Sequence, residues 1–338
     1  MDGKGHGMVT EGARAALADN FLAENGWADA ARTRIAGDAS NRSYDRLLRA
    51  DGTTAILMDA PPDTGEDVRP FVRIAMHLRQ NGLSAPEILA VEERSGFLLL
   101  EDLGDDLFAR LMQADPARET SLYRAAVDVL ISLHGCEPMP LAACDAQWLS
   151  DMTEPLFEWY LPKDTSGLRT AFKAVFDPLA QAVAAAPHVT ILRDYHAQNL
   201  LWLPERTGVA RVGLLDFQDA LAGHRAYDLV SILQDARRDV STELETDMLA
   251  YYLDRVPVDP TTFRRDYAVL GVQRNLRILG IFARLAKRDG KASYVDLVPR
   301  VWNYVQRNLA HPELKPLAEV LADVPAPTRA FLEQLKAR

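Results

Sequence analysis

The sequence lacks any uninterrupted apolar run of the roughly 18 residues that a transmembrane helix needs. Its first residues, Met1 to Gly12, are polar and glycine-rich, unlike the apolar core of a secretory signal. Cysteine is also scarce: only Cys136 and Cys144 occur, with no cluster of Cys or His at metal-ligand spacing. We therefore expect a cytoplasmic protein with no membrane partner and with two structural thiols.

Positive charge is in short supply as well. The formal net charge is −10, which argues against general affinity for nucleic-acid phosphates, because that binding needs a basic face. ATP stays compatible, since magnesium and a few local arginines can neutralise its phosphates. The 338 residues exceed the roughly 250 to 300 at which one core usually divides, so we expect two lobes around a cleft.

The first hundred residues have the periodicity of a sheet with helices before and within it. Residues 12–25 and 66–81 have helical spacing, and the second helix is expected to pack on the sheet. Asp51-Gly52 is a tight-turn dipeptide inside a three-stranded antiparallel meander. The expected strands are 33–36, 43–49, 54–58, 87–92 and 96–101.

Helical patterns dominate after Asp102-Leu103-Gly104, which marks a change of architecture. We therefore predict an α+β, bilobal fold. Residues 1–103 form an N-terminal lobe with an antiparallel sheet and one main helix, and the hinge lies near 101–104. Residues 104–338 form a larger, mostly helical C-terminal lobe. Strand-like stretches return only at 189–192, 200–203 and 209–215.

Three oxygen-bearing side chains follow these late strands. Asp194 and Asn199 lie five positions apart, and Asp216 follows Asn199 by seventeen positions. Phosphoryl transfer needs a base for the acceptor hydroxyl and hard oxygen ligands for magnesium. The pattern therefore predicts that Asp194 is the catalytic base and that Asn199 and Asp216 bind Mg²⁺.

These residues resemble the aminoglycoside phosphotransferase family, a branch of the protein-kinase-like fold that also includes choline and homoserine-type kinases. Its catalytic loop, His-x-Asp-x-x-x-x-Asn, is matched by Asp194 and Asn199. Its second motif is Ile-Asp-Phe/Trp-x-Asp-x-x-x-Gly-x-x-x-Tyr-Asp-Leu. Residues 216–219, Gly223 and Tyr227-Asp228-Leu229 match it. The resemblance covers nearly the whole chain and implies ATP and Mg²⁺ as cofactors. Leu192 departs from it, because the family usually has a loop-bracing His there.

A second departure concerns the lysine that holds the nucleotide phosphates on the third strand of protein kinases. Met58 occupies that place, and Lys4 is the only lysine in the first hundred residues. Another cation must then serve, and we choose Arg46. Surface arginines with no phosphate contact are the alternative, and the other arginines considered are Arg42, Arg69 and Arg73.

The remaining nucleotide contacts are expected from two backbone segments. The small residues before and at Asn41 would lie over the phosphates, where backbone amides can approach. The segment from Glu101 to Leu103 resembles the hinge that meets the adenine edge. The predicted nucleotide-binding residues are Gly37, Asp38, Ala39, Ser40, Asn41, Arg46, Glu101 and Leu103.

A closer resemblance is to the branch that phosphorylates the anomeric hydroxyl of N-acetylmuramate and N-acetylglucosamine during peptidoglycan recycling. That branch also lacks the strand lysine. The segments that carry the resemblance are 37–44, 58–62, 98–105, 216–220 and 273–285. They imply an amino sugar as the small-molecule acceptor.

A sugar site needs aromatic faces and polar groups, and a lactyl carboxylate needs arginines. The predicted acceptor-binding residues are Glu154, Trp159, Tyr160, His196, Asp219, Arg237 and Arg274. For the aromatic residues, a place in the core is the alternative. One rival function is an aminoglycoside kinase, which the basic segment 273–288 disfavours. The others are a choline-like kinase and a nucleotide-binding pseudokinase. The sequence predicts no oligomeric state.

Overall fold

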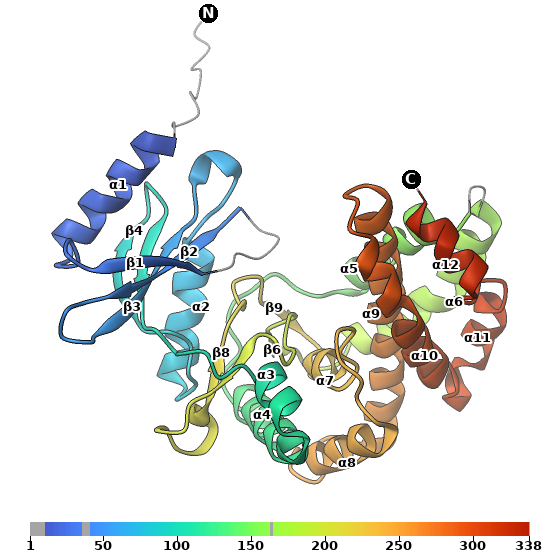
Figure 1. Ribbon diagram of the computed structural model, residues 1–338. Coiled ribbons are helices and arrows are strands. Elements are labelled where there is room, and N and C mark those ends of the chain that lie inside the picture. The colour runs from blue at the N-terminus through green and yellow to red at the C-terminus, as the bar shows by residue number, and fades with distance from the viewer. Residues whose placement is uncertain (1–10, 36–40, 163–164, 338) are drawn as a thin grey trace, which may run out of the picture. The chain divides into compact units, whose positions relative to one another are not determined.

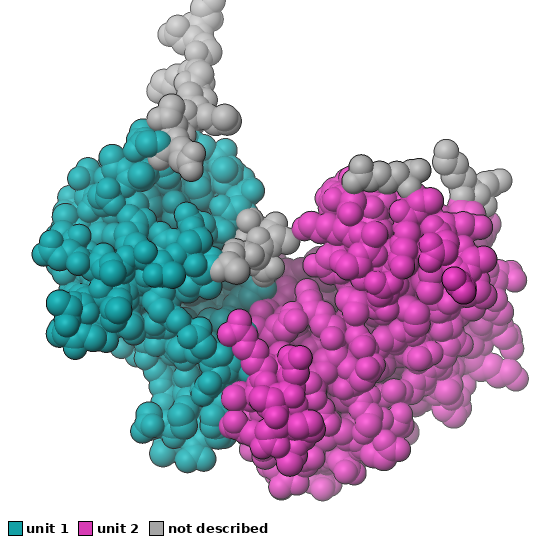
Figure 2. Space-filling model, in the orientation of Figure 1, with its two compact units in different colours: residues 1–107, 201–219 teal, residues 108–200, 220–338 magenta. Residues whose placement is uncertain are grey.

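The computed structural model describes residues 11–35, 41–162 and 165–337. The chain divides into two compact units, which Figure 2 colours separately. Unit 1 comprises residues 1–107 and 201–219, and unit 2 comprises residues 108–200 and 220–338. The sequence predicted a single boundary near residue 103. It did not predict that residues 201–219 belong to unit 1.

Hydrogen bonds explain why the returning segment belongs to unit 1. The Trp202 amide donates to the Asp106 carbonyl at 2.8 Å, and the Leu214 amide donates to the Ser84 carbonyl at 2.9 Å. Ser84 also donates its hydroxyl to the Ala210 carbonyl at 2.7 Å. Strands β7 (Leu200–Trp202) and β8 (Val212–Leu214) pair within this segment.

Unit 1 is built on a five-stranded antiparallel sheet in the order β1-β2-β3-β5-β4 (Figure 1). The predicted meander is confirmed, and its second turn uses Gly52 at φ 86° while Asp51 accepts a hydrogen bond from the Thr53 amide. The strands are β1 Ala31–Ile35, β2 Ser43–Leu48, β3 Thr54–Asp59, β4 Ile88–Glu92 and β5 Phe97–Leu100.

Both faces of the central strands are covered. Helix α1 (Glu11–Glu24) buries Phe21 and Leu22 in one cluster with Leu57 and Leu99. Met58, Leu98 and Leu100 point to the opposite face and are also buried. Helix α2 (Arg69–Gln80) lies beside the sheet and buries Phe71, Ile74, Ala75 and Leu78. The sequence predicted the packing of one helix, but α1 covers a sheet face as well.

Unit 2 is mostly helical and centres on the 28-residue helix α9. Two glycines let neighbouring segments approach it closely: a Cβ at Gly280 would lie 2.1 Å from the Pro155 carbonyl carbon, and one at Gly271 would lie 2.4 Å from Asn308. The helices are α3 Phe108–Ala114, α4 Glu119–His134, α5 Ala146–Asp151, a π-helical turn Leu156–Tyr160, α6 Ser166–Ala184, α7 Ala226–Leu233, α8 Thr242–Leu253, α9 Pro260–Lys287, α10 Val298–Leu309, α11 Lys315–Leu321 and α12 Arg329–Lys336.

A short antiparallel ribbon in unit 2 positions the predicted catalytic loop. Strand β6 (Val189–Ile191) ends at that loop and pairs with β9 (Leu221–Gly223), which leads into α7. Gly223 makes room for this pairing, because a Cβ there would lie 2.6 Å from Ile191 Cδ1 and 3.1 Å from Cys144 Cβ. The sequence analysis missed β9, yet this pairing brings the start of α7 to the loop. Within the described residues, no helix combines the length and apolar character needed to cross a membrane.

Candidate active site

The loop that carries Asp194 is held by a buried carboxylate. Asp228, on α7, is completely buried and accepts hydrogen bonds from the amides of Leu192 at 2.6 Å and Arg193 at 2.9 Å. Burial raises the pKa of Asp228 to about 6, although these amides and the charge of Arg274 oppose the rise. The contacts go to the backbone, so the loop is braced although Leu192 replaces the family's histidine.

The same loop contains a backbone conformation that few residues adopt. Arg193 has φ 68°, in the left-handed region, and its carbonyl accepts a hydrogen bond from Ser231 at 3.0 Å. Asn199 closes the loop by donating its Nδ2 to the Asp194 carbonyl at 2.9 Å. Strained backbone held by surrounding bonds is common at functional sites. Because Nδ2 is used inside the loop, Oδ1 is the Asn199 atom suited to bind a cation.

His196 lies inside the loop and is neutral at physiological pH. Burial lowers its pKa to about 4, against a smaller opposing effect of Asp235. Its Nε2 lies 3.2 Å from Arg237 Nη1 and 3.4 Å from Asn199 Nδ2, so it accepts from these donors. His196 and Arg237, both predicted acceptor-binding residues, therefore contact each other and support Asn199.

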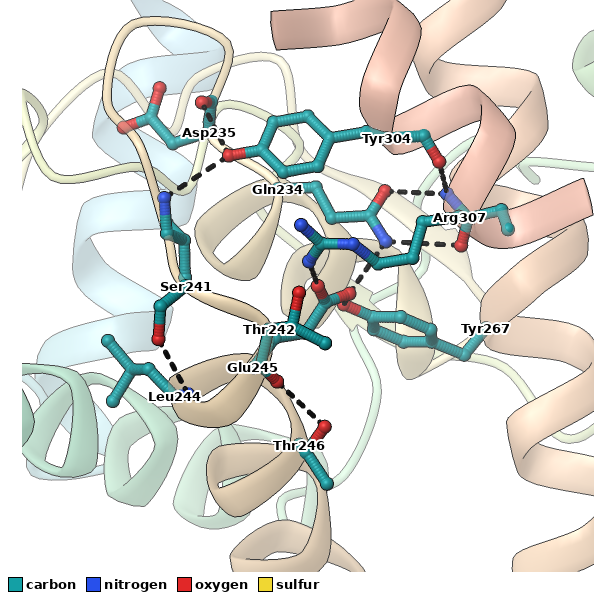
Figure 3. Close-up of polar contacts among 12 residues, drawn as sticks. Gln234, Asp235, Ser241, Thr242, Leu244, Glu245, Thr246, Tyr267, Tyr304 and Arg307 are labelled. Atoms are coloured by element: carbon teal, nitrogen blue, oxygen red, sulfur yellow. Dashed lines mark hydrogen bonds and ion pairs between the residues drawn. The ribbon is translucent and has the colours of Figure 1, made fainter. Parts of the chain in front are cut away.

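A buried polar network holds the segment that presents Arg237 (Figure 3). Glu245, on α8, accepts hydrogen bonds from Gln234 at 2.8 Å and Tyr267 at 2.7 Å, and it pairs with Arg307. Tyr304 donates its hydroxyl to the Arg238 carbonyl at 3.2 Å. Helices α8, α9 and α10 thus fix the chain just after α7.

Asp216 belongs to unit 1 and has its own strained backbone. Its φ is 58°, and its Oδ1 accepts a hydrogen bond from Gln218 at 2.7 Å. Phe217 is buried, and its ring centroid lies 4.8 Å from that of Phe71 on α2. Asp219 is exposed, and its charge acts on Arg42. Among the described residues no three His, Cys, Asp or Glu side chains form a metal cluster.

The nucleotide-binding prediction falls partly outside the described residues, which exclude Gly37, Asp38, Ala39 and Ser40. Asn41 is exposed and makes a long contact, 3.4 Å, to the Thr64 carbonyl. Arg42 forms an ion pair with Glu66 at 2.6 Å. Burial opposes the charge of Arg42, but Glu66 and other nearby groups raise its pKa.

The segment predicted as the hinge has both paired and unpaired backbone groups. The Glu101 amide donates to the Glu87 carbonyl at 2.8 Å, and the Glu101 carboxylate pairs with Arg79 and Arg206. Within the described part of the chain, the Glu101 carbonyl and the Leu103 amide form no hydrogen bond with the protein. One acceptor and one donor are thus left for a ligand.

Arg46 is paired with carboxylates of the linker. It contacts Asp102 at 2.8 Å and Asp105 at 2.6 Å, and the hydrogen bond to Asp105 is the main cause of its raised pKa. Its side chain therefore ties β2 to the segment after β5. A phosphate contact of Arg46 stays a prediction, and it would have to share or break these bonds.

The predicted aromatic acceptor site is not assembled as expected. Tyr160 is a core residue, because it is 1% exposed and donates its hydroxyl to the Pro325 carbonyl at 2.9 Å. Glu154 forms ion pairs with Arg169 and Lys173. Trp159 is half-buried, and its carbonyl accepts from Lys287. These contacts explain the positions of the three residues without any ligand. For Tyr160 they agree with the alternative interpretation, a place in the core.

A different aromatic pair lies beside the catalytic loop. Trp148, half-buried on α5, meets Tyr227 edge to face with ring centroids 6.1 Å apart. The guanidinium of Arg193 lies 5.5 Å from the Trp148 ring, and that of Arg274 lies 5.6 Å from the Tyr227 ring. Arg274 was predicted from the sequence as an acceptor-binding residue. It lies beside the ring of Tyr227, which contacts that of Trp148, and neither aromatic residue was predicted as a site residue.

Comparison with known proteins decides the family. Residues 31–267 match the model of the phosphotransferase enzyme family. The chain belongs to this family. A Caulobacter vibrioides protein named N-acetylmuramate/N-acetylglucosamine kinase is 39% identical, over 92% of this chain and 96% of the relative. The sequence prediction of a phosphotransferase, and thus of an enzyme, is confirmed.

Solved structures confirm the protein-kinase-like fold of this phosphotransferase. A choline/ethanolamine kinase family protein from Mesorhizobium loti superposes with a TM-score of 0.62 at 14% identity, covering 97% of this chain and 99% of that one. The ADP-bound aminoglycoside phosphotransferase APH(2'')-Ib gives a TM-score of 0.60 at 11% identity, covering 85% and 97%. At these identities the similarity concerns the fold alone.

Three residues beside the catalytic loop are not among the site residues that the sequence predicted. Asp228 belongs to the second family motif, but the sequence did not reveal that its carboxylate binds the backbone of the loop. Arg277 lies three residues after Arg274 on α9, a spacing that places both on one helix face. Trp148 gave no signal, since nothing in its neighbourhood marks it apart from other half-buried aromatic residues.

Proposed function

We propose that this phosphotransferase uses ATP and Mg²⁺ to phosphorylate the anomeric hydroxyl of N-acetylmuramate and N-acetylglucosamine. The observation that carries the choice of acceptor is the 39% identity to a kinase named for these two sugars, over nearly the full length of both chains. The Asp228-held loop supports the chemistry, because it presents Asp194 and Asn199 from a rigid backbone.

In the proposed reaction the anomeric oxygen attacks the γ-phosphorus of ATP, the bond to the bridging oxygen breaks, and ADP leaves. Asp194 takes the hydroxyl proton as the oxygen attacks. The Asp194 carbonyl is fixed by Asn199, so the carboxylate starts from a defined backbone position. The products are ADP and the sugar 1-phosphate.

Asn199 and Asp216 are the proposed magnesium ligands. An amide oxygen and a carboxylate are hard donors, and Mg²⁺ commonly uses one or two protein oxygens with phosphates and water. This donor set fits Mg²⁺, which would supply charge neutralisation at the phosphates.

For the nucleotide, we propose that the Glu101 carbonyl and the Leu103 amide receive the adenine edge. Their lack of partners within the described residues supports this role. Residues 37–41 stay the predicted phosphate loop. We expect the enzyme to act in the cytoplasm on small molecules, with no nucleic-acid partner.

An ATP-consumption assay with Asp194→Asn beside the unmutated protein tests this function. We expect magnesium-dependent turnover with both acetylated sugars and a loss of about 100- to 10,000-fold in the variant, the range for removal of a general base. Asp254→Asn, the same change at an exposed residue of unit 2, serves as the control. Turnover only with kanamycin or choline, or unchanged turnover in Asp194→Asn, would contradict the proposal.

A further inference from the structure

Two arginines on α9, one buried and one half-buried, have no carboxylate partner within the described part of the chain. Arg274 is 7% exposed, and Arg277 is half-buried one helical turn later. Among the described residues neither guanidinium forms an ion pair with a carboxylate, and the buried Nε of Arg274 has no hydrogen-bond partner. A buried charge without a partner is costly, so an arrangement of this kind is typical of a site that binds an anion.

The surrounding charges do not neutralise these arginines. Burial lowers the pKa of Arg277, and the nearby charges of Arg274 and Arg193 lower it further. Asp194 acts in the opposite direction, but it is the proposed base. The oxygens of Asp228 are already used by two backbone amides. Positive charge is therefore concentrated beside the catalytic loop.

Neighbouring groups complete a place for a polar ligand with an apolar face. The hydroxyl of Tyr227 is buried without a hydrogen-bond partner, and its ring lies beside Arg274. Trp148 adds a half-buried ring in contact with Tyr227. Two orphaned buried polar groups in one cluster are uncommon in a folded protein, and a bound ligand would satisfy both.

We propose that Arg274 and Arg277, with Tyr227, form the subsite that binds the carboxylate of an acidic sugar acceptor. This inference rests on the proposed function, and it assigns the lactyl carboxylate of N-acetylmuramate to these two arginines. N-acetylglucosamine lacks that carboxylate. The subsite therefore determines how strongly the enzyme prefers one sugar over the other, while both sugars react at the same Asp194.

The test is a comparison of KM and kcat for both sugars and for ATP in Arg277→Gln. We expect the KM for N-acetylmuramate to rise about 10- to 100-fold, as for loss of a charge-assisted hydrogen bond, with kcat retained. The KM for N-acetylglucosamine and for ATP should change less than about threefold. Arg277→Lys should fall between, since it keeps the charge and loses the planar fork.

Arg264→Gln is the matched control, because it removes the same charge from an exposed position of the same helix. Equal losses for both sugars, or a raised KM for ATP, would overturn the subsite and leave the proposed function standing. Unmutated protein that phosphorylates N-acetylglucosamine alone would do the same. Unmutated protein that phosphorylates neither sugar would overturn the proposed function itself, and the subsite with it.

Discussion

Three arginines of unit 1 and two arginines of α9, in unit 2, deal with their charge in opposite ways. In unit 1, Arg14 pairs with Asp59 at 2.6 Å, Arg42 with Glu66 at 2.6 Å, and Arg46 with two aspartates. On α9, the buried Arg274 and the half-buried Arg277 have no such partner among the described residues. The first group stabilises the unit internally, whereas the second leaves its charge for a ligand.

A carboxylate from each unit, Asp105 and Asp228, shows a similar contrast. Asp105 pairs with Arg46 while 66% of its side chain is exposed, so water screens the pair. Asp228 is completely buried and binds backbone amides. The comparison predicts that single changes of charge have large effects near α9 and the catalytic loop, and small effects on the unit 1 ion pairs.

Asp228→Asn should give the largest effect. An asparagine in this place presents an N–H group to one of two backbone N–H groups, so a buried hydrogen bond is lost. We expect a loss of about 2 to 4 kcal/mol in the free energy of unfolding. We also expect kcat to fall about 100-fold, because the loop with Asp194 shifts. Urea denaturation and steady-state kinetics measure the two effects.

Asp254→Asn provides the comparison for this variant too, since it makes the same change at an exposed site. A folded Asp228→Asn protein with wild-type kcat would show that the amide contacts do not position Asp194. The brace of the loop would then have to come from Ser231 and Asn199.

The loop that carries Asp194 and Asn199 could be located from the sequence because these residues are close in the chain and follow an apolar strand. The meander could be predicted for a similar reason, since its register depends on alternation and on the Asp51-Gly52 turn. Such local signals also gave the helical character of unit 2.

What the sequence did not predict depends on contacts between distant segments. Strand β9 has three residues and forms only because β6 lies beside it. The packing of α1 on the sheet and the return of 201–219 to unit 1 are also tertiary. Tyr160 and Trp148 show the limit for side chains: both are aromatic residues in helical segments, and only the fold distinguishes the core residue from the one beside the loop.

The second largest effect should be the dependence of stability on pH that comes from the buried His134 of unit 2. Burial, together with the charges of Arg225 and His224, lowers the pKa of His134 to about 3. Between about pH 5.5 and 4 the unfolded chain carries a proton on this imidazole that the folded chain does not. Wild-type stability should therefore fall with decreasing pH by about 1.4 kcal/mol per pH unit more than that of His134→Gln.

Urea denaturation at several pH values measures this difference in slope. Asp228, with its raised pKa, works in the opposite direction below about pH 6, because the folded chain then binds the extra proton. That contribution is common to both proteins and cancels when they are compared. Parallel stability curves for the two would contradict the assignment of a neutral, buried His134.

Arg46→Gln should have the smallest effect on stability, and it tests the unit 1 half of the comparison between paired and unpaired arginines. Its guanidinium pairs with Asp102 and with the exposed Asp105, so its loss should cost about 1 kcal/mol or less of stability. A change of less than about threefold in the KM for ATP would contradict the predicted phosphate contact, because the charge of Arg46 would then be balanced by its carboxylate partners alone. A rise of about tenfold, the loss of one charge-assisted hydrogen bond, would instead support the predicted phosphate contact. It would also show that an arginine of unit 1 can bind a ligand although it is paired with carboxylates, whereas we assign ligand binding to the unpaired arginines of α9.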